Sequence, residues 1–169
     1  MTIKKYLQQF SKGQLIEQIN ELHKKYKDVK SYYSFFLNQD EEKTLKKYKA
    51  IIYESFYPKR GNKLSLSQAR KALSDFKKLS PSPHYIADAM LYFVECGVIF
   101  TNDFGDIDEP FYNSMEGMFK DACIFIQKNG LEKLFKERCK KIMEDTSGVG
   151  WGFHDYLTDT YCQFFEDTE

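Results

Sequence analysis

The sequence predicts an all-α fold: a single domain over residues 1–169, built from about eight helices stacked as antiparallel helical hairpins. Apolar residues recur at helical spacing along nearly the whole chain, and convincing period-two runs are absent. The breaks between these segments mostly span two to eight residues, as connections between antiparallel helices do. A chain of 169 residues can also bury a core without disulfides or metals.

Capping residues set the ends of the helices predicted in the first 80 residues. Ser11 is suited to cap the second helix, Asp28 the third, and either Ser65 or Ser67 the fifth, because their side-chain oxygens accept hydrogen bonds from free N–H groups. Pro58 ends the fourth helix because proline cannot continue a helical hydrogen-bond ladder. The apolar stripes expected to face a core are Ile3, Tyr6, Leu7 and Phe10; Leu15, Ile16, Ile19, Leu22 and Tyr26; Tyr33 and Phe36; Leu45, Tyr48, Ile52 and Phe56; and Leu66, Ala69, Leu73, Phe76 and Leu79.

The second half of the chain carries equally clear helix boundaries. Ser82, followed by proline, starts one helix, and Asp108 caps the next. Asn129 and Gly130 stop that helix, and Gly148 is predicted to be a left-handed cap near the end of the following one. The apolar stripes are Ile86, Ala89, Met90, Phe93, Gly97 and Phe100; Tyr112, Met115, Phe119, Ala122 and Ile126; Leu131, Leu134, Phe135, Arg138, Ile142 and Met143; and Phe153, Leu157, Tyr161 and Phe164.

Cysteine spacing and hydropathy narrow the class of protein. Cys96, Cys123, Cys139 and Cys162 lie on the apolar sides of predicted helices and lack CxxC-type spacing, so we expect reduced core thiols and no metal or disulfide. The N-terminal residues lack the apolar region of a secretory signal, and no segment is apolar enough to span a bilayer. These patterns predict a cytoplasmic protein with no membrane partner.

The net charge is zero but unevenly distributed. Residues 1–80 carry 18 Lys and Arg against 8 Asp and Glu, whereas residues 81–169 carry 7 against 17. The split indicates either a basic face for an anionic partner or two halves that attract each other.

The densest acidic segment, residues 102–109, is called the acidic turn; it contains no basic residue, and its carboxylates are Asp103, Asp106, Asp108 and Glu109. An EF-hand is excluded, because placing Gly105 at the sixth loop position puts Phe100 at the first, where a carboxylate is required. In the favoured interpretation, Asp108 and Glu109 stabilise a helix N-terminus. The alternative is a carboxylate site for Mg²⁺ or Ca²⁺.

A glycine-rich turn surrounds the only tryptophan, Trp151. Its glycines do not match GxGxxG and follow no strand, which excludes a dinucleotide fingerprint. His154 could act as a ligand or general base, and Asp155 and Asp159 share a helical face. These three residues would extend a metal site, although a hydrogen-bonded, half-buried histidine and a helix-start aspartate are the simpler interpretation.

Basic residues gather before a helix N-terminus, where free N–H groups attract anions. Lys59, Arg60 and Lys63 precede that helix, and Arg70 lies within it. A phosphate or nucleic acid is one candidate ligand, with Trp151 and His154 as further candidate binding residues. The favoured interpretation is internal, with Arg60 and Arg70 pairing with Asp106 and Asp108 of the acidic turn.

Five segments together carry a family resemblance: PKRG at 58–61, SQARK at 67–71, FKKLSP at 76–81, FTNDFGDIDEPFYNSME at 100–116 and SGVGWGFHD at 147–155. They resemble the bacterial family catalogued as domain of unknown function 6155. The resemblance implies a bacterial, cytoplasmic, all-helical domain. It assigns no catalytic or binding residue to this chain.

The chain has no GxSxG, HExxH or P-loop motif, and no catalytic residue is predicted. The leading hypothesis is a non-catalytic helical binding or scaffold module without a cofactor, whose partner is another protein. A carboxylate-based metal site or metal-dependent hydrolase is one alternative. A nucleic-acid or phosphate binder using the basic N-terminal half is the other. The sequence leaves the oligomeric state open.

Overall fold

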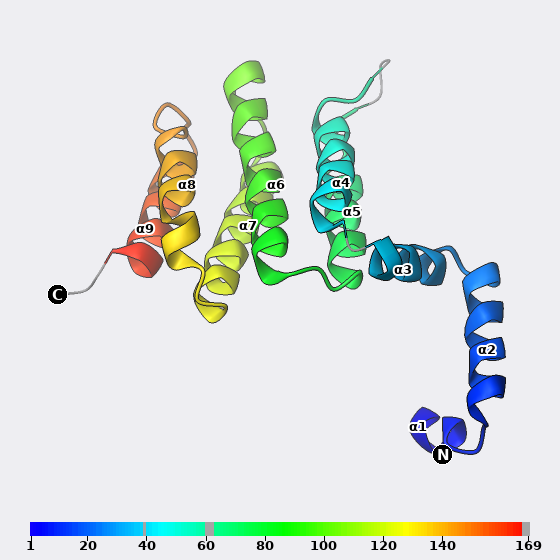
Figure 1. Cartoon of the computed structure of the whole chain (residues 1–169). Coiled ribbons are helices and arrows are strands. Elements are labelled where there is room, and N and C mark those ends of the chain that lie inside the picture. Colours follow the sequence, from blue (N-terminus) through cyan, green and yellow to red (C-terminus); the bar gives the residue numbers. More distant parts are fainter. Residues whose placement is uncertain (39, 60–62, 167–169) are drawn as a thin grey trace. The chain divides into compact units, whose positions relative to one another are not determined.

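A computed structural model describes residues 1–38, 40–59 and 63–166 (Figure 1). These residues form nine α-helices and no β-strand, so the predicted all-α class is confirmed. Contacts divide the chain into two compact units, Met1–Asp40 and Glu41–Glu169. The single domain over 1–169 therefore stays a prediction, and each unit has an architecture of its own.

The N-terminal unit consists of α1 (Ile3–Leu7), α2 (Lys12–Lys25) and α3 (Lys27–Asn38). As predicted, Ser11 caps α2: its Oγ accepts the N–H of Gln14 at 3.2 Å, while Gln14 Oε1 accepts the N–H of Ser11 at 2.8 Å. This reciprocal capping box satisfies two N–H groups that the helix leaves free. Asp28 lies in the first turn of α3 and does not precede it, so its predicted capping role is wrong.

The second unit consists of three antiparallel hairpins that stand side by side (Figure 1). They pair α4 (Glu41–Phe56) with α5 (Leu66–Lys78), α6 (Pro83–Phe104) with α7 (Glu109–Lys128), and α8 (Glu132–Glu144) with α9 (Phe153–Phe165). The middle hairpin joins the other two, because α6 packs against α4 and α8 while α7 packs against α9. The predicted stack of helical hairpins is confirmed for this unit.

Aromatic side chains fill the core of the second unit. Phe56 and Phe93 meet edge to face with ring centroids 5.4 Å apart, and Tyr112 lies 5.1 Å from Phe153. Most residues of the predicted stripes in this unit are buried, but Leu134 is 63% exposed, which contradicts its predicted core position. The stripe of α2 also differs from expectation, because Ile16, Ile19, Leu22 and Tyr26 remain exposed and do not face a core.

Two turns differ from the sequence prediction. The helix α6 continues to Phe104 because no helix-breaking residue precedes Gly105, so Asn102 and Asp103 of the acidic turn are helical. Gly148 does not adopt the predicted left-handed conformation, since α8 already ends at Glu144. Trp151 and Gly152 adopt it instead, with φ of 63° and 71°, immediately before α9.

Cys96, Cys123 and Cys139 are buried free thiols, as their predicted core positions require, whereas Cys162 is only half-buried. None of the described helices combines the length and apolar character that crossing a bilayer requires.

Candidate functional site

The ends of α4 and α6 are joined by a hydrogen bond between Tyr57 and Asp103. The Tyr57 hydroxyl donates to Asp103 Oδ2 at 2.6 Å. Burial raises the pKa of Tyr57 well above its usual value, and the hydrogen bond to the Asp103 carboxylate raises it further, because both favour the neutral phenol. The contact therefore holds two helices together and keeps Tyr57 protonated.

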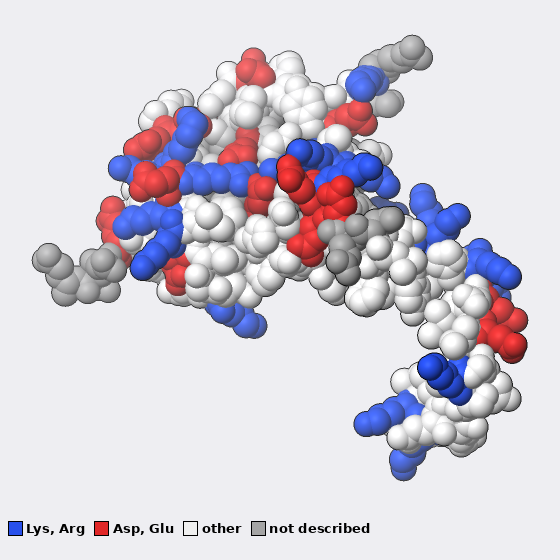
Figure 2. Space-filling model, viewed as in Figure 1, with Lys and Arg blue, Asp and Glu red and all other residues white. Residues whose placement is uncertain are grey.

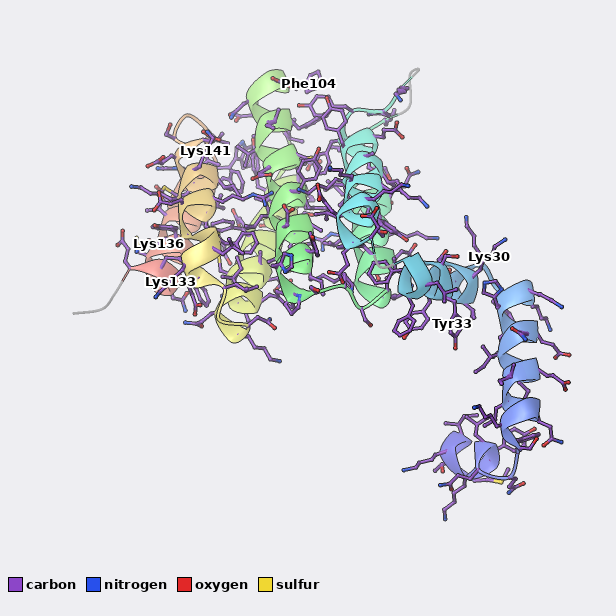
Figure 3. All side chains as sticks on the ribbon, viewed as in Figure 1. Lys30, Tyr33, Phe104, Lys133, Lys136 and Lys141 are labelled. Atoms are coloured by element: carbon purple, nitrogen blue, oxygen red, sulfur yellow. The ribbon has the colours of Figure 1, made fainter. Side chains whose placement is uncertain are left out.

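An apolar pocket of about 350 Å³ opens beside this hydrogen bond; its lining consists of Phe56, Tyr57, Pro58, Leu64, Phe100 and Phe104. We call it the loop-end pocket. Phe104 is 64% exposed, and its ring centroid lies 4.7 Å from that of Phe100. Figure 3 shows Phe104 at the C-terminal end of α6. An aromatic side chain left largely in water at the edge of an apolar pocket is typical of a binding surface.

One carboxylate of the acidic turn, Asp103, lies beside the pocket through its hydrogen bond to Tyr57, and the other carboxylates follow it in the sequence. Asp108 Oδ1 accepts the N–H of Phe111 at 2.9 Å, so Asp108 caps α7 as predicted. Asp106 Oδ1 lies 3.5 Å from the Tyr112 hydroxyl. In the described part of the chain, no ion pair with a Lys or Arg involves Asp103, Asp106, Asp108 or Glu109. Their negative charge is therefore left to solvent or to a partner.

The acidic turn also lies against the glycine-rich turn between α8 and α9. A Cβ atom at Gly150 would be 4.0 Å from both carboxylate oxygens of Asp106. The Asn102 side-chain amide donates to the backbone oxygen of Asp145 at 3.0 Å. Trp151 follows Gly150 and is 62% exposed, so a second aromatic side chain is presented on the turn beside the acidic turn.

His154 faces the end of α8. Its Nδ1 lies 2.9 Å from Thr146 Oγ1 and 3.2 Å from the Met143 carbonyl oxygen. Because the Thr146 hydroxyl already donates to Met143 at 2.6 Å, Nδ1 carries the proton and donates to this pair of oxygens. His154 is thus half-buried and hydrogen-bonded, in agreement with the simpler interpretation of the sequence.

The residues of the metal alternative are not gathered into one site. Within 1–38, 40–59 and 63–166, no group of three or more His, Cys, Asp or Glu side chains is placed to hold a metal ion. The residues concerned are Asp103, Asp106, Asp108, Glu109, His154, Asp155 and Asp159. The geometry brings Asp106 to the glycine-rich turn and gives the metal alternative no further support.

A family model described as Family of unknown function (DUF6155) matches residues 1–165. The chain belongs to this family. No curated protein and no solved structure matches the chain. The match to DUF6155 extends over both units as far as residue 165, and the resemblance predicted from the sequence motifs is confirmed.

In this DUF6155 chain the predicted pairing of Arg70 with the acidic turn is wrong. Its guanidinium donates to Ser114 Oγ at 2.8 Å and to the Ser114 carbonyl oxygen at 3.3 Å, and lies 5.8 Å from the ring centroid of Phe93. Arg70 lies on α5 and Ser114 on α7, so the Arg70 side chain links these two helices and does not contact the acidic turn. Arg60, the other predicted partner, lies outside the described residues.

The remaining basic candidates of the DUF6155 chain, Lys59 and Lys63, lie in the connection between α4 and α5. Lys59 Nζ is 2.8 Å from Glu54 Oε1 in an exposed ion pair. Lys59, Lys63 and Glu54 help to line an open polar pocket of about 500 Å³. The Glu54 carboxylate weakens the attraction of this pocket for a phosphate.

A charge cluster that the sequence did not reveal joins three helices of the DUF6155 chain. Asp88 on α6 accepts hydrogen bonds from Lys49 on α4, at 2.7 Å, and from Arg138 on α8. Arg138 also donates to the Glu95 carboxylate through Nε at 2.6 Å and Nη2 at 2.8 Å. Burial acts to raise the pKa of Asp88, but the hydrogen bonds from Lys49 and Arg138 outweigh it and lower the pKa.

This cluster contains two cations and two anions, so it stabilises the fold and offers no net charge to a ligand. Figure 2 shows basic and acidic side chains intermingled on the face of the second unit that is in view. Arg138 was expected on an apolar stripe. The available signal was a pair of carboxylates, Asp88 and Glu95, in a segment of α6 (residues 85–100) that has no other charged residue.

Sequence reasoning also missed Tyr57 and Phe104, the two residues that define the loop-end pocket. Phe104 continues the helical spacing of Gly97 and Phe100 on α6. That spacing could have identified it as an apolar residue at the very end of the helix, where the core no longer covers it.

Proposed function

We propose that this DUF6155 protein is a non-catalytic helical binding or scaffold module of the bacterial cytoplasm, whose partner is another protein. The partner inserts an apolar side chain into the loop-end pocket and contacts Phe104. The observation that carries this proposal is the 64% exposure of Phe104 at an apolar pocket beside the Asp103 carboxylate, which has no described ion pair. Aromatic residues at pockets of this kind contribute a large share of binding energy in protein interfaces.

The charge around the pocket indicates the chemistry of the partner. Asp103 would attract a Lys or Arg side chain that flanks the apolar anchor. Charges at the rim of an interface mainly raise the association rate and select the partner, whereas the buried anchor sets the dissociation rate. The partner segment is therefore an apolar residue with a cationic neighbour.

The side chains near the pocket support binding over catalysis. Tyr57 donates a hydrogen bond to Asp103 and has a raised pKa, so it stays protonated and is a poor general base or nucleophile at neutral pH. Asp108 is used as a helix cap, and Nδ1 of His154 is held by the end of α8.

Selection of peptides from a displayed random library on the full chain tests this function. We expect enrichment of peptides in which an apolar residue is flanked by Lys or Arg, with affinity that weakens as salt is added. Phe104→Ser should weaken the selected peptides by about tenfold or more. Ile99→Ser is the matched control, since Ile99 is 51% exposed on the same helix and lies outside the pocket lining.

Thermal melts of both variants confirm that they remain folded before binding is compared. Equal affinity of the Phe104→Ser variant and the unmodified chain would exclude the loop-end pocket as the binding surface. Failure of the library to yield any binder would count against the module hypothesis itself.

A further inference from the structure

The helices of the N-terminal unit do not bury one another's apolar side chains. Ten of the 17 large apolar residues that are exposed in the described chain lie within residues 1–40. None of the side chains described for this unit is buried. On α2, Ile16, Ile19 and Leu22 are 49%, 40% and 45% exposed, and Tyr26, the residue that follows the last turn, is 47% exposed. Their spacing of three, three and four residues places them along one face of the helix.

A unit of this kind needs an external surface to pack against. The helix α2 has 14 residues and a complete capping box, yet isolated helices of this length are marginal in water. Residues 1–40 contain no cysteine, so no disulfide can stabilise them. Domains of about 40 residues usually depend on disulfides, metals or oligomerisation. The exposed stripe is therefore a contact surface.

We propose that this surface binds a second copy of the same chain, with the two α2 helices packed antiparallel about a two-fold axis. The axis passes between the levels of Ile19 and Leu22. Ile19 then faces Leu22 of the second copy, and Ile16 faces Tyr26 of the second copy, so each of the four exposed residues meets an equivalent apolar stripe. This inference is independent of the function proposed for the loop-end pocket.

Charge selects the antiparallel arrangement. Glu17 lies toward the N-terminal end of α2, and Lys24 and Lys25 lie at its C-terminal end. Antiparallel packing brings Glu17 level with Lys24 and Lys25 of the second copy, twice per dimer. Parallel packing would instead bring Glu17 level with Glu17 and align the two helix dipoles unfavourably. The zero net charge of the chain adds no overall repulsion between copies.

The exposed apolar area of the N-terminal unit is comparable to one side of a standard interface. The helix α3 adds Tyr32, Phe36 and Leu37, which are 39%, 62% and 76% exposed. Together with the stripe of α2, these side chains leave roughly 700–800 Å² in water, taking ~200 Å² for a fully exposed large apolar residue. A standard interface buries about 800 Å² per partner. His23 and Tyr33, with ring centroids 6.3 Å apart, hold α2 against α3, and Figure 3 shows Tyr33 on α3.

Sedimentation velocity of the full chain tests the proposal. We expect a dimer that dissociates on dilution, and a monomer when Ile19→Asp and Leu22→Asp are combined. Leu134→Asp, at a residue 63% exposed on α8, is the matched control and should leave the dimer unchanged. A monomeric unmodified chain up to ~100 µM would overturn the proposal. So would a dimer that survives the double substitution.

The test also distinguishes two other surfaces that would cover the apolar stripe of α2, and either result would overturn the proposal. A monomeric chain whose α2 amides resist hydrogen exchange would place the stripe against the chain's own second unit. A monomeric chain that binds vesicles of anionic phospholipid would make it a membrane contact.

Charge reversal tests the arrangement without disturbing an apolar residue. Glu17→Lys should weaken the dimer by about threefold to tenfold, and adding Lys24→Glu with Lys25→Glu should restore it. No change in dimer affinity, or no restoration, would overturn the antiparallel register. Phe104→Ser should leave the dimer intact, so failure of this inference is distinguishable from failure of the loop-end pocket.

Discussion

Gly97 of α6 lies directly against Met115 of α7. A Cβ atom at Gly97 would overlap Met115 Sδ and lie 2.9 Å from Met115 Cγ. Met115 is fully buried, so its thioether has little room to move away. The absence of a side chain at Gly97 therefore allows α6 and α7 to approach closely within their hairpin.

Gly97→Ala should destabilise the protein. In a helix, alanine is more favourable than glycine by about 1 kcal/mol, but overpacking a filled core costs ~1–3 kcal/mol and should outweigh that gain. Urea unfolding monitored by circular dichroism gives the change in the free energy of unfolding.

Gly117→Ala is the matched control for this substitution. Gly117 lies on α7, and nothing is within 4 Å of a Cβ placed there. Only the helix propensity changes, so this variant should be more stable by ~0.5–1 kcal/mol. Equal effects of the two substitutions would show that the approach of Gly97 to Met115 is not tight.

Arg138→Met should destabilise the second unit by about 2–3 kcal/mol at neutral pH, because it removes the cation that binds both Asp88 and Glu95. Methionine keeps much of the apolar volume of the arginine side chain, so the loss of stability measures the effect of removing the charge. Asp88 has a lowered pKa, so its contribution is present above its usual pKa of 3.8 and is lost as the pH falls through the lower value of the folded state. The difference between variant and unmodified chain should therefore shrink below pH 3.8.

Lys141→Met provides the control on the same helix. Lys141 is 73% exposed and pairs with Asp145 only at the surface. An exposed pair of this kind contributes ~0–1 kcal/mol, so this variant should melt close to the unmodified chain. A loss as large as that of Arg138→Met would contradict the distinction between the two sites.

The stacking of the second unit and many helix ends could be predicted because their causes are local. Ser11 and Asp108 cap helices through atoms three residues away, and the apolar spacing of α7 identifies its buried face without reference to other helices. The end of α6 was misplaced for a related reason. Asn102 and Asp103 resemble turn residues, but nothing between Phe100 and Phe104 breaks the helix.

The candidate site depended on contacts between distant residues and was mostly missed. Asp103 was singled out for its charge, whereas its partner Tyr57 lies 46 residues away. Arg138 was assigned to an apolar stripe, although its guanidinium binds carboxylates on another helix. Helical spacing shows which face is apolar but not what covers it, which is also why the exposed stripe of α2 was expected in a core.

Alkaline pH should destabilise the protein through Cys96. Burial raises the pKa of the Cys96 thiol from 9.0 to about 12, and burial likewise raises the pKa of Tyr92 from 10.0 to about 12. Between pH 9 and pH 12 the unfolded chain loses protons that the folded chain keeps, so stability falls as the pH rises. Cys96 alone contributes a slope of up to ~1.4 kcal/mol per pH unit.

Cys96→Ala isolates this effect. The variant should lose about 1–2 kcal/mol at pH 8 from the smaller side chain, and its stability should then fall less steeply. Urea unfolding in reducing buffer from pH 8 to pH 11 gives both curves. Parallel curves would show that Cys96 ionises equally in the folded and unfolded chain.

Two adjacent residues before α9, Trp151 and Gly152, have a left-handed backbone conformation, and exchanging their residue types should change stability in opposite directions. Trp151 has a φ of 63° and is 62% exposed, so Trp151→Gly should relieve backbone strain with little loss of packing and stabilise the protein by up to ~1 kcal/mol. Gly152 has a φ of 71° with nothing within 4 Å of an added Cβ. Gly152→Ala should therefore cost ~1–2 kcal/mol through the backbone alone. Thermal melts followed by circular dichroism compare the two, and a destabilised Trp151→Gly variant would indicate that the indole packs against the turn more than its exposure suggests.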